Sequence, residues 1–143
     1  MGHSLMGEWL FPFGAAACLP LKEQLKPRHM PHFVIDCSSS ILEQQDWQTL
    51  LSIVHDTADA TGLFDAGNIK VRVRPYEYST VGNEPGDFLH VFGYIMQGRT
   101  VQQRAELSEA IIRELKMLFP EVPIVSMNVM EFEQATYCNR NLV

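Results

Sequence analysis

One short segment of the chain carries cations at a spacing that could bind anions. Lys70, Arg72 and Arg74 are two residues apart and alternate with Val71 and Val73. Successive side chains of a strand point to opposite faces, so the three cations would share one face and the valines the other. Such a line of charge can discourage aggregation at a sheet edge, or it can bind carboxylates in an otherwise acidic protein. The spacing alone leaves both interpretations open.

A second candidate for binding an anion is Arg99. It lies in the segment 97–100, Gln-Gly-Arg-Thr, between an apolar run and the start of an amphipathic one. Loops at strand ends often carry ligand contacts, and the N-terminus of a helix favours negative charge. A solvent-exposed arginine in a turn explains the same pattern, so this alternative also stays open.

The other side chains that could do chemistry lack the spacing of a metal site or of a nucleophilic triad. His32, His55 and His90 are scattered, and His90 falls in an apolar run, which favours a hydrogen-bonded core or lining histidine. The three cysteines are widely separated and include no CxxC pair, which indicates reduced thiols. The sequence therefore predicts neither a metal nor an organic cofactor.

Length and charge limit the partners of the protein. The chain has 143 residues, which suits one compact domain, and a formal net charge of -6 at pH 7. An acidic chain lacks the basic surface that nucleic acids require. No apolar run is long enough to span a bilayer. We expect a cytoplasmic protein that binds neither nucleic acid nor a membrane.

The elements that would position the cations follow a repeated order. The first half predicts a strand at 32–37, a helix ended by Gly62, and the alternating strand at 69–78. The inward stripe predicted for this helix consists of Trp47, Leu50, Leu51, Val54 and Ala58, with Asp46 or the Ser40 and Glu43 pair as its cap.

The second half repeats the order of strand, helix and strand. It predicts a largely buried strand at 87–96, a helix closed by Pro120 and Pro123, and a strand at 124–132. The inward stripe predicted here consists of Val101, Ala105, Ser108, Ile112, Leu115 and Phe119, with Thr100 and Gln103 as a capping box.

The expected fold is therefore α+β, with two βαβ units forming a four-stranded sheet and two helices on one face. The chain offers no further element to cover the opposite face. We expect burial of that face in a symmetric oligomer.

The beginning of the chain does not follow this pattern. We expect residues 1–30 to be an N-terminal extension, explained by a mis-called start, a leader or an ordered extension, and residues 31–143 to form the domain. A secretory signal fits less well, because no Lys or Arg precedes the apolar stretch.

The start of the expected domain resembles a known family. Residues 30–37, Met-Pro-His-Phe-Val-Ile-Asp-Cys, are similar to the opening of 5-carboxymethyl-2-hydroxymuconate isomerase, a member of the tautomerase superfamily. The similarity continues through 60–64, 69–73, 88–91 and 98–100, and covers roughly 30–143. It implies a homotrimer without cofactors that shifts a double bond in an unsaturated 2-hydroxy or 2-oxo dicarboxylate of aromatic catabolism.

The resemblance also implies roles for individual residues. In the family the initiator methionine is removed and the exposed proline is the general base, a position that Pro31 matches. A terminal amine has a pKa of about 8, which nearby cations or burial lower toward neutrality. Arg99, Arg72 and Lys70 would bind the substrate carboxylates and stabilise the dienolate. Lys70 stands where the family pattern has an arginine, and an ammonium lacks the bidentate grip of a guanidinium.

Two alternatives to this function remain. While residue 30 is bonded to Pro31, the proline nitrogen is a tertiary amide with no basic lone pair. A chain that keeps its extension would then be a non-catalytic oligomeric binding or scaffold protein on the same fold. Another tautomerase activity, on a smaller 2-hydroxymuconate or a phenylpyruvate-like enol, is the other alternative, because function resides in the site and not in the fold.

Overall fold

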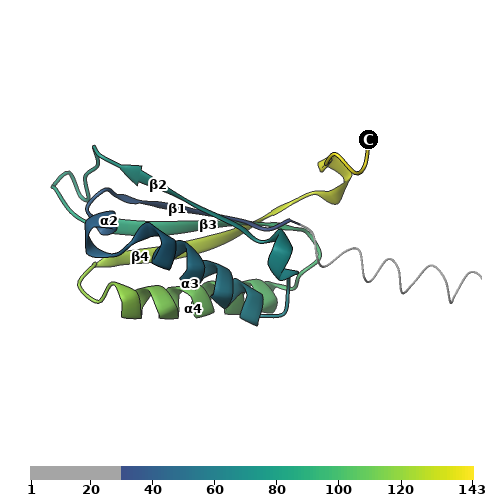
Figure 1. Cartoon of the computed structure of the whole chain (residues 1–143), viewed down its shortest axis with the longest axis horizontal. Helices are drawn as coiled ribbons and strands as arrows, with labels where there is room; N and C mark the ends of the chain where they lie inside the picture. Colours follow the sequence, from purple (N-terminus) through teal and green to yellow (C-terminus); the bar gives the residue numbers. More distant parts are fainter. Residues whose placement is uncertain (1–29) are drawn as a thin grey trace, which may run out of the picture.

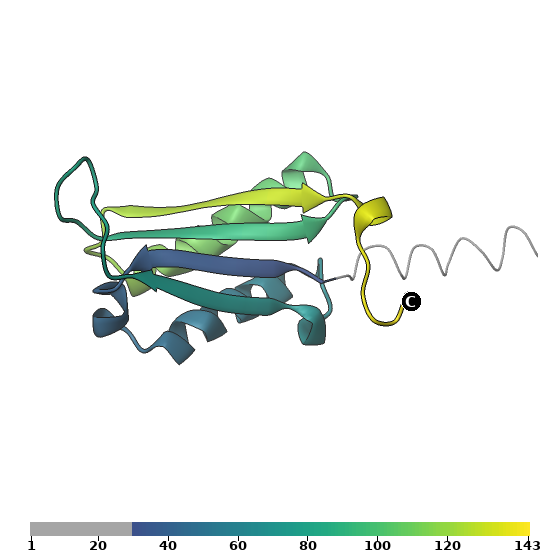
Figure 2. The ribbon, with the colours of Figure 1, turned by 90° about the horizontal axis from the view of Figure 1, so that it is seen from above.

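A mixed sheet of four strands forms one layer of the protein (Figure 2). The computed structural model describes residues 30–143, so the expected extension, apart from Met30, lies outside the described residues. The strands lie in the order β2-β1-β3-β4. Their bounds are β1 (His32–Ser38), β2 (Lys70–Tyr76), β3 (Phe88–Met96) and β4 (Ile124–Phe132).

Two parallel strand pairs meet at an antiparallel centre. β1 is parallel to β2 and β3 is parallel to β4, whereas β1 and β3 are antiparallel. A helix connects the strands of each pair, α3 (Trp47–Ala60) in the first and α4 (Val101–Leu118) in the second. Both helices pack on the same face of the sheet (Figure 1). The predicted α+β arrangement of two βαβ units is confirmed.

The start of α3 distinguishes between the two caps that the sequence allowed. The Asp46 carboxylate accepts a hydrogen bond from the Thr49 backbone N–H at 3.3 Å, so Asp46 is the cap. Ser40 precedes a separate short helix, α2 (Ile41–Gln44), and makes no capping hydrogen bond. Its hydroxyl instead donates to the Asp87 carboxylate.

The end of α3 and the start of α4 agree with the sequence. Gly62 follows α3 with a φ of 75°, a left-handed conformation that glycine adopts without strain. At α4, the Thr100 hydroxyl accepts from the Gln103 N–H at 3.1 Å, and the Gln103 side chain accepts from the Thr100 N–H at 2.9 Å. The predicted capping box is confirmed.

The inward stripes of the helices differ from the prediction at their first residues. Trp47 is 50% exposed and Val101 is 73% exposed. A helical side chain leans toward the N-terminus, and at the first residue no earlier turn exists for it to cover. Ala105 is also exposed. The fully buried stripe of α4 consists of Leu107, Ile111 and Leu115.

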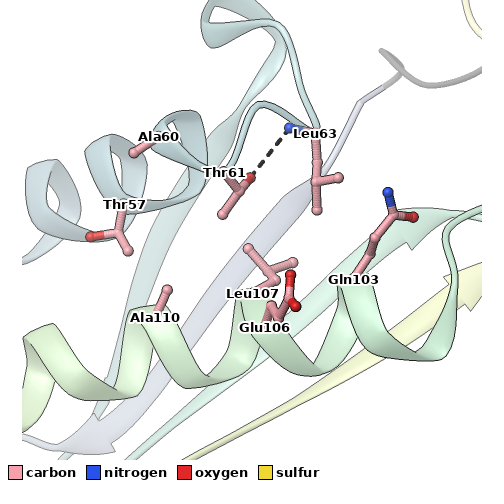
Figure 3. Close-up of a pocket in the computed structure, with 8 residues that line it drawn as sticks. All are labelled: Thr57, Ala60, Thr61, Leu63, Gln103, Glu106, Leu107 and Ala110. Carbon is pink, nitrogen blue, oxygen red and sulfur yellow. Dashed lines mark hydrogen bonds between the residues drawn. The ribbon is translucent and has the colours of Figure 1, made fainter.

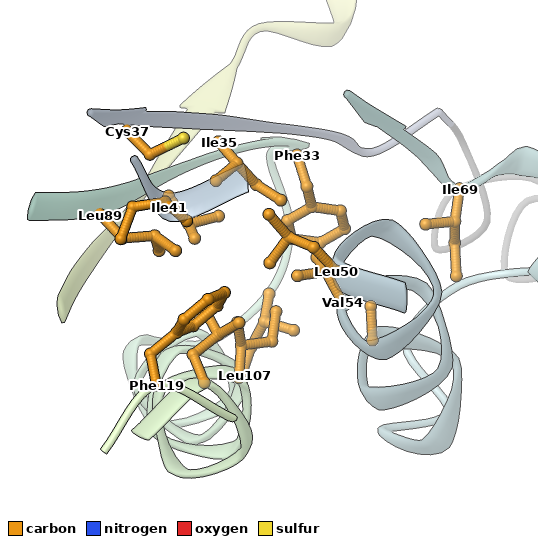
Figure 4. Close-up of a cluster of buried hydrophobic side chains, with 14 of the residues drawn as sticks. Phe33, Ile35, Cys37, Ile41, Leu50, Val54, Ile69, Leu89, Leu107 and Phe119 are labelled. Carbon is orange, nitrogen blue, oxygen red and sulfur yellow. The ribbon is translucent and has the colours of Figure 1, made fainter. Parts of the chain in front are cut away.

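The core fills the space between the helices and the sheet (Figure 4). Phe33, Ile35 and Cys37 alternate along β1 and are fully buried against α3 and α4 residues such as Leu50 and Leu107. Burial, with a smaller contribution from the Asp36 charge, raises the pKa of the Cys37 thiol to about 11. Cys37 is therefore a protonated core residue and not a nucleophile.

The other face of the sheet, which we call the open face, has no helix over it within residues 30–143 (Figure 1). The strand registers place its side chains in rows across the sheet. The three central rows are Lys70, His32, Tyr94 and Met130; Arg72, Val34, Phe92 and Asn128; and Arg74, Asp36, His90 and Ser126. Among residues 30–143, the helices also lack the length and hydrophobicity of a membrane-spanning segment.

The burial of α4 gives a first prediction. Leu107→Ala removes a fully buried side chain and should lower the free energy of unfolding by about 2–5 kcal/mol, measured by urea denaturation. Val101→Ala, at the exposed start of the same helix, should change it by less than about 1 kcal/mol. Equal losses for the two variants would contradict the orientation of α4.

Candidate active site

The start of the sheet brings Pro31 and Lys70 together. Pro31 precedes β1 and is buried, and Lys70 is the first residue of β2. Because β1 and β2 run in parallel, both strands begin at the same edge. The Lys70 backbone N–H donates to the Pro31 carbonyl at 3.1 Å. The predicted base and one predicted cation are therefore neighbours.

Within residues 30–143, no carboxylate lies within ion-pair distance of the Lys70 ammonium. Its Nζ donates to the Asn68 carbonyl at 2.7 Å and lies 3.4 Å from the Met30 Sδ. Partial burial, followed by the charge of Arg72, lowers the pKa of Lys70. A cation in such a place is stabilised by binding an anion.

Arg72 has a neutral partner. Its Nη1 lies 3.1 Å from the Nδ1 of His32. A guanidinium can only donate, so the imidazole nitrogen accepts. Burial, and then the charges of Lys70 and Arg72, lower the pKa of His32 and favour its neutral form. The charge of Arg72 is thus not cancelled by this contact.

Arg74, the third cation of the strand, is neutralised. Its Nε donates to one Asp36 carboxylate oxygen at 2.7 Å and its Nη2 to the other at 3.3 Å. The Tyr76 hydroxyl also donates to Asp36, at 3.1 Å. Among residues 30–143, neither Lys70 nor Arg72 has a carboxylate within ion-pair distance. The structure therefore separates two available cations from one that is paired.

Arg99 is buried and does not project into solvent. It is 8% exposed, with Nη1 donating to the Met96 carbonyl at 3.3 Å and Nη2 to the Leu63 carbonyl at 2.5 Å. Its guanidinium carbon lies 5.0 Å from the centre of the Phe64 ring. Burial lowers its pKa, and the charge of Glu131 opposes that shift. The alternative of an exposed arginine in a turn is wrong.

Arg99 also connects to the region of Pro31 through aromatic packing. The Phe64 ring meets Phe33 edge to face at 6.0 Å, and Phe33 is two residues after Pro31. Arg99 therefore lies at the same end of the sheet as the other predicted site residues. No direct contact joins it to Lys70 or Arg72 among the hydrogen bonds of the described residues.

The remaining histidines have other partners. His90 lies on the open face, where its Nδ1 is 2.7 Å from the Ser126 hydroxyl and its Nε2 is 2.7 Å from the side-chain amide oxygen of Asn128. His55 pairs with Asp56 on the surface of α3 at 3.1 Å. Within the part of the chain that the structure describes, no group of three or more His, Cys, Asp and Glu residues could hold a metal ion.

A cavity of about 370 Å³ lies elsewhere, between α3 and α4 (Figure 3). None of the predicted site residues lines it, and it lacks a cation. Its lining residues are Thr57, Ala60, Thr61, Leu63, Gln103, Glu106, Leu107 and Ala110. The chemistry of the chain is concentrated at the start of β1 and β2 instead.

The sequence did not predict the two side chains that make one arginine of β2 neutralised and leave the charge of the other available. Asp36 neutralises Arg74 and His32 binds Arg72, and the residue types near Asp36 and His32 indicate neither contact. The signal was the period of two in 32–37, which places both side chains on the face that the cations share once the strands pair.

Solved structures of known proteins share this fold. The chain is similar to a 5-carboxymethyl-2-hydroxymuconate isomerase from Deinococcus radiodurans R1, with a TM-score of 0.70 and 23% identity over 81% of this chain and 92% of that one. It is also similar to a macrophage migration inhibitory factor-like protein from Entamoeba histolytica, with a TM-score of 0.63 and 12% identity over 78% and 96% of the two chains. The chain therefore has the same class of fold as these two proteins.

Sequence comparison identifies the family within that class. Residues 31–143 match the family model of 5-carboxymethyl-2-hydroxymuconate isomerase, and the chain belongs to this family. The 5-carboxymethyl-2-hydroxymuconate Delta-isomerase of Escherichia coli is 28% identical over 106 residues, which is 73% of this chain and 84% of that enzyme. The resemblance inferred from the sequence is confirmed.

The contacts of Arg99 give a prediction on stability. Arg99→Ala leaves two carbonyl groups without their charged donor and removes the stacking on Phe64. We expect a loss of about 2–4 kcal/mol in the free energy of unfolding, measured by urea denaturation. Arg74→Ala is the matched control, since the Arg74 side chain is 54% exposed and solvent screens its ion pair, so its loss should cost little stability. An Arg99→Ala loss no larger than the control would refute a buried Arg99.

Proposed function

We propose that this member of the isomerase family is a cofactor-independent enzyme with Pro31 as its general base. Its proposed substrate is an unsaturated 2-hydroxy or 2-oxo dicarboxylate of aromatic catabolism, such as 5-carboxymethyl-2-hydroxymuconate. The observation that carries the proposal is that Pro31 is bonded through its carbonyl to Lys70, which shares one face of β2 with Arg72. Neither cation has a carboxylate partner among residues 30–143. A base next to two available cations suits the abstraction of a proton from an anionic carbon acid.

The proposed reaction moves one proton and one double bond. The free amine of Pro31 removes a proton from a carbon of the substrate, and the electron pair of that C–H bond delocalises onto the 2-oxo oxygen as a dienolate. The resulting ammonium returns the proton to a different carbon, and the double bond shifts. The amine is regenerated, so no other reactant is consumed.

The cations have distinct parts in this proposal. Lys70 and Arg72 are on the same face of β2, about 7 Å apart along the strand, and bind the carboxylates of the substrate. Their charges lower the pKa of the Pro31 amine and stabilise the dienolate. Arg99 adds positive charge at the same end of the sheet. A direct bond from Arg99 to the substrate requires its guanidinium to release the Leu63 or the Met96 carbonyl.

The domain proposed for catalysis is 31–143, and the residues before it must be absent for activity. Met30 is bonded to Pro31, which makes the proline nitrogen an amide, and the Met30 Sδ lies 3.4 Å from the Lys70 ammonium. Both features block the site in a chain that keeps Met30. Such a chain favours the second candidate, a non-catalytic oligomeric protein on the tautomerase fold.

A homotrimer is the proposed assembly, with the open face as its interface. Val34 is nearly fully buried within the open face, and Phe92 and Tyr94 stack there with ring centres 6.3 Å apart. An apolar centre with a polar surround is typical of an interface between subunits.

We also propose a cytoplasmic location. The thiols of Cys37 and Cys138 are free, which favours a reducing compartment.

The base is tested by comparing chains that differ at their N-terminus. Protein from the native gene is characterised by intact mass and N-terminal sequencing, and the same material is assayed on a 2-hydroxymuconate substrate. A chain that begins at Pro31 should be active, and Pro31→Ala at that terminus should lose about 100-fold or more in kcat with an unchanged unfolding transition. A chain that retains Met30 should be inactive. Equal activity of the chain with Met30 would exclude Pro31 as the base.

The assembly is tested by placing a charge in the centre of the open face. Phe92→Asp should convert trimers to monomers in sedimentation equilibrium, because an unpaired carboxylate is costly to bury. Trp47→Asp introduces the same charge at an exposed position of the helical layer and should leave the assembly unchanged. Trimers of the Phe92→Asp protein, or a wild-type monomer, would contradict the proposed interface.

A further inference from the structure

The two arginines of β2 have partners of different charge on β1. Arg74 is directly opposite Asp36 in the strand register and is held by a carboxylate. Arg72 is opposite Val34 and reaches instead to the neighbouring His32 imidazole. The same type of side chain is therefore held in one case by an anion and in the other by a neutral acceptor.

The surroundings of His32 keep its imidazole neutral. Lys70 is directly opposite it on β2, and Tyr94 is directly opposite it on β3. The one carboxylate on the open face of its own strand, Asp36, is bound to Arg74. Partial burial, and then the charges of Lys70 and Arg72, thus lower the pKa of His32. With Nδ1 accepting from Arg72, the ring proton is on Nε2.

We propose that His32 is a positioning residue, which holds the Arg72 guanidinium through a neutral acceptor and so leaves its full charge for a substrate carboxylate. This inference rests on the proposed role of Lys70 and Arg72 in binding carboxylates. A carboxylate at position 32 would hold Arg72 equally well, but it would neutralise the guanidinium, as Asp36 neutralises Arg74, and would repel an anionic substrate. The neutral acceptor makes the site selective for dianions, since two cations stay available.

The pairing itself is tested by NMR on the full-length chain labelled with ¹⁵N-histidine. At pH 7.5 the His32 ring should show an unprotonated Nδ1 and a protonated Nε2, with the signal assigned by its loss in His32→Asn. This measurement needs no substrate and no activity. A ring protonated on Nδ1 would overturn the inference while leaving Pro31 and its proposed role unaffected.

The consequence for binding is tested with adipate, a saturated dicarboxylate that cannot be isomerised. Its affinity is measured by NMR titration of the chain that begins at Pro31, because Met30 contacts the Lys70 ammonium in a longer chain. His32→Asn, whose amide oxygen replaces Nδ1 as a neutral acceptor, should bind within about threefold of the wild type. His32→Asp should bind about tenfold more weakly, because it adds a negative charge near the ligand. Hexanoate, with one carboxylate, should be affected less than adipate.

A matched control separates the local charge from the net charge. Gln48→Asp adds one negative charge at an exposed position of α3, on the other side of the sheet, and should bind adipate like the wild type. An equal loss in Gln48→Asp and His32→Asp would overturn the inference, and so would equal affinity of His32→Asp and the wild type.

The two proposals fail in different ways. If no variant and no wild-type chain binds adipate, then Lys70 and Arg72 do not bind carboxylates, and both the proposed function and the inference are contradicted. If binding follows the expected order while Pro31→Ala keeps full isomerase activity, then the base is wrong and the role of His32 stands.

Discussion

The parallel pairing of β1 with β2 is the constraint on which the candidate site depends. It places His32 opposite Lys70, and so it brings the beginning of both strands to one edge of the sheet. A shift of one residue would turn the cations of β2 toward the core, where Val71 and Val73 now pack. The apolar residues on the face of the sheet that the helices cover therefore fix the position of the charges on the open face.

The sequence predicted the order of the elements well, because the period of two in the strands and the period near four in the helices are local properties. It predicted Asp46 and Gly62 at the ends of α3 for the same reason, although it left a choice of cap. It failed where a contact depends on chain segments far apart. The burial of Arg99 requires the Leu63 carbonyl from the other βαβ unit, and no spacing near residue 99 indicates this contact.

The candidate site shows the same division between local and distant information. The spacing of Lys70, Arg72 and Arg74 predicted a shared face, yet it could not show which of the three cations is free to bind an anion. Their ranking comes from β1, where an aspartate faces one arginine and a histidine faces another. The available positive charge is therefore smaller than the sequence suggests and is confined to the end of the sheet next to Pro31.

The hydrogen bond from the Lys70 backbone to the Pro31 carbonyl has a consequence for a chain that begins at Pro31. The first residue of a protein ordinarily frays, because nothing before it restrains its backbone. Here the restraint acts on the carbonyl side of the proline, whereas cleavage of the preceding bond frees the nitrogen side. A new terminus at this position would therefore be rigid from the moment it forms. Cleavage would make the lone pair of the nitrogen basic, while the hydrogen bond to the carbonyl would still hold the ring in place. The amine could then accept a proton without first losing conformational entropy.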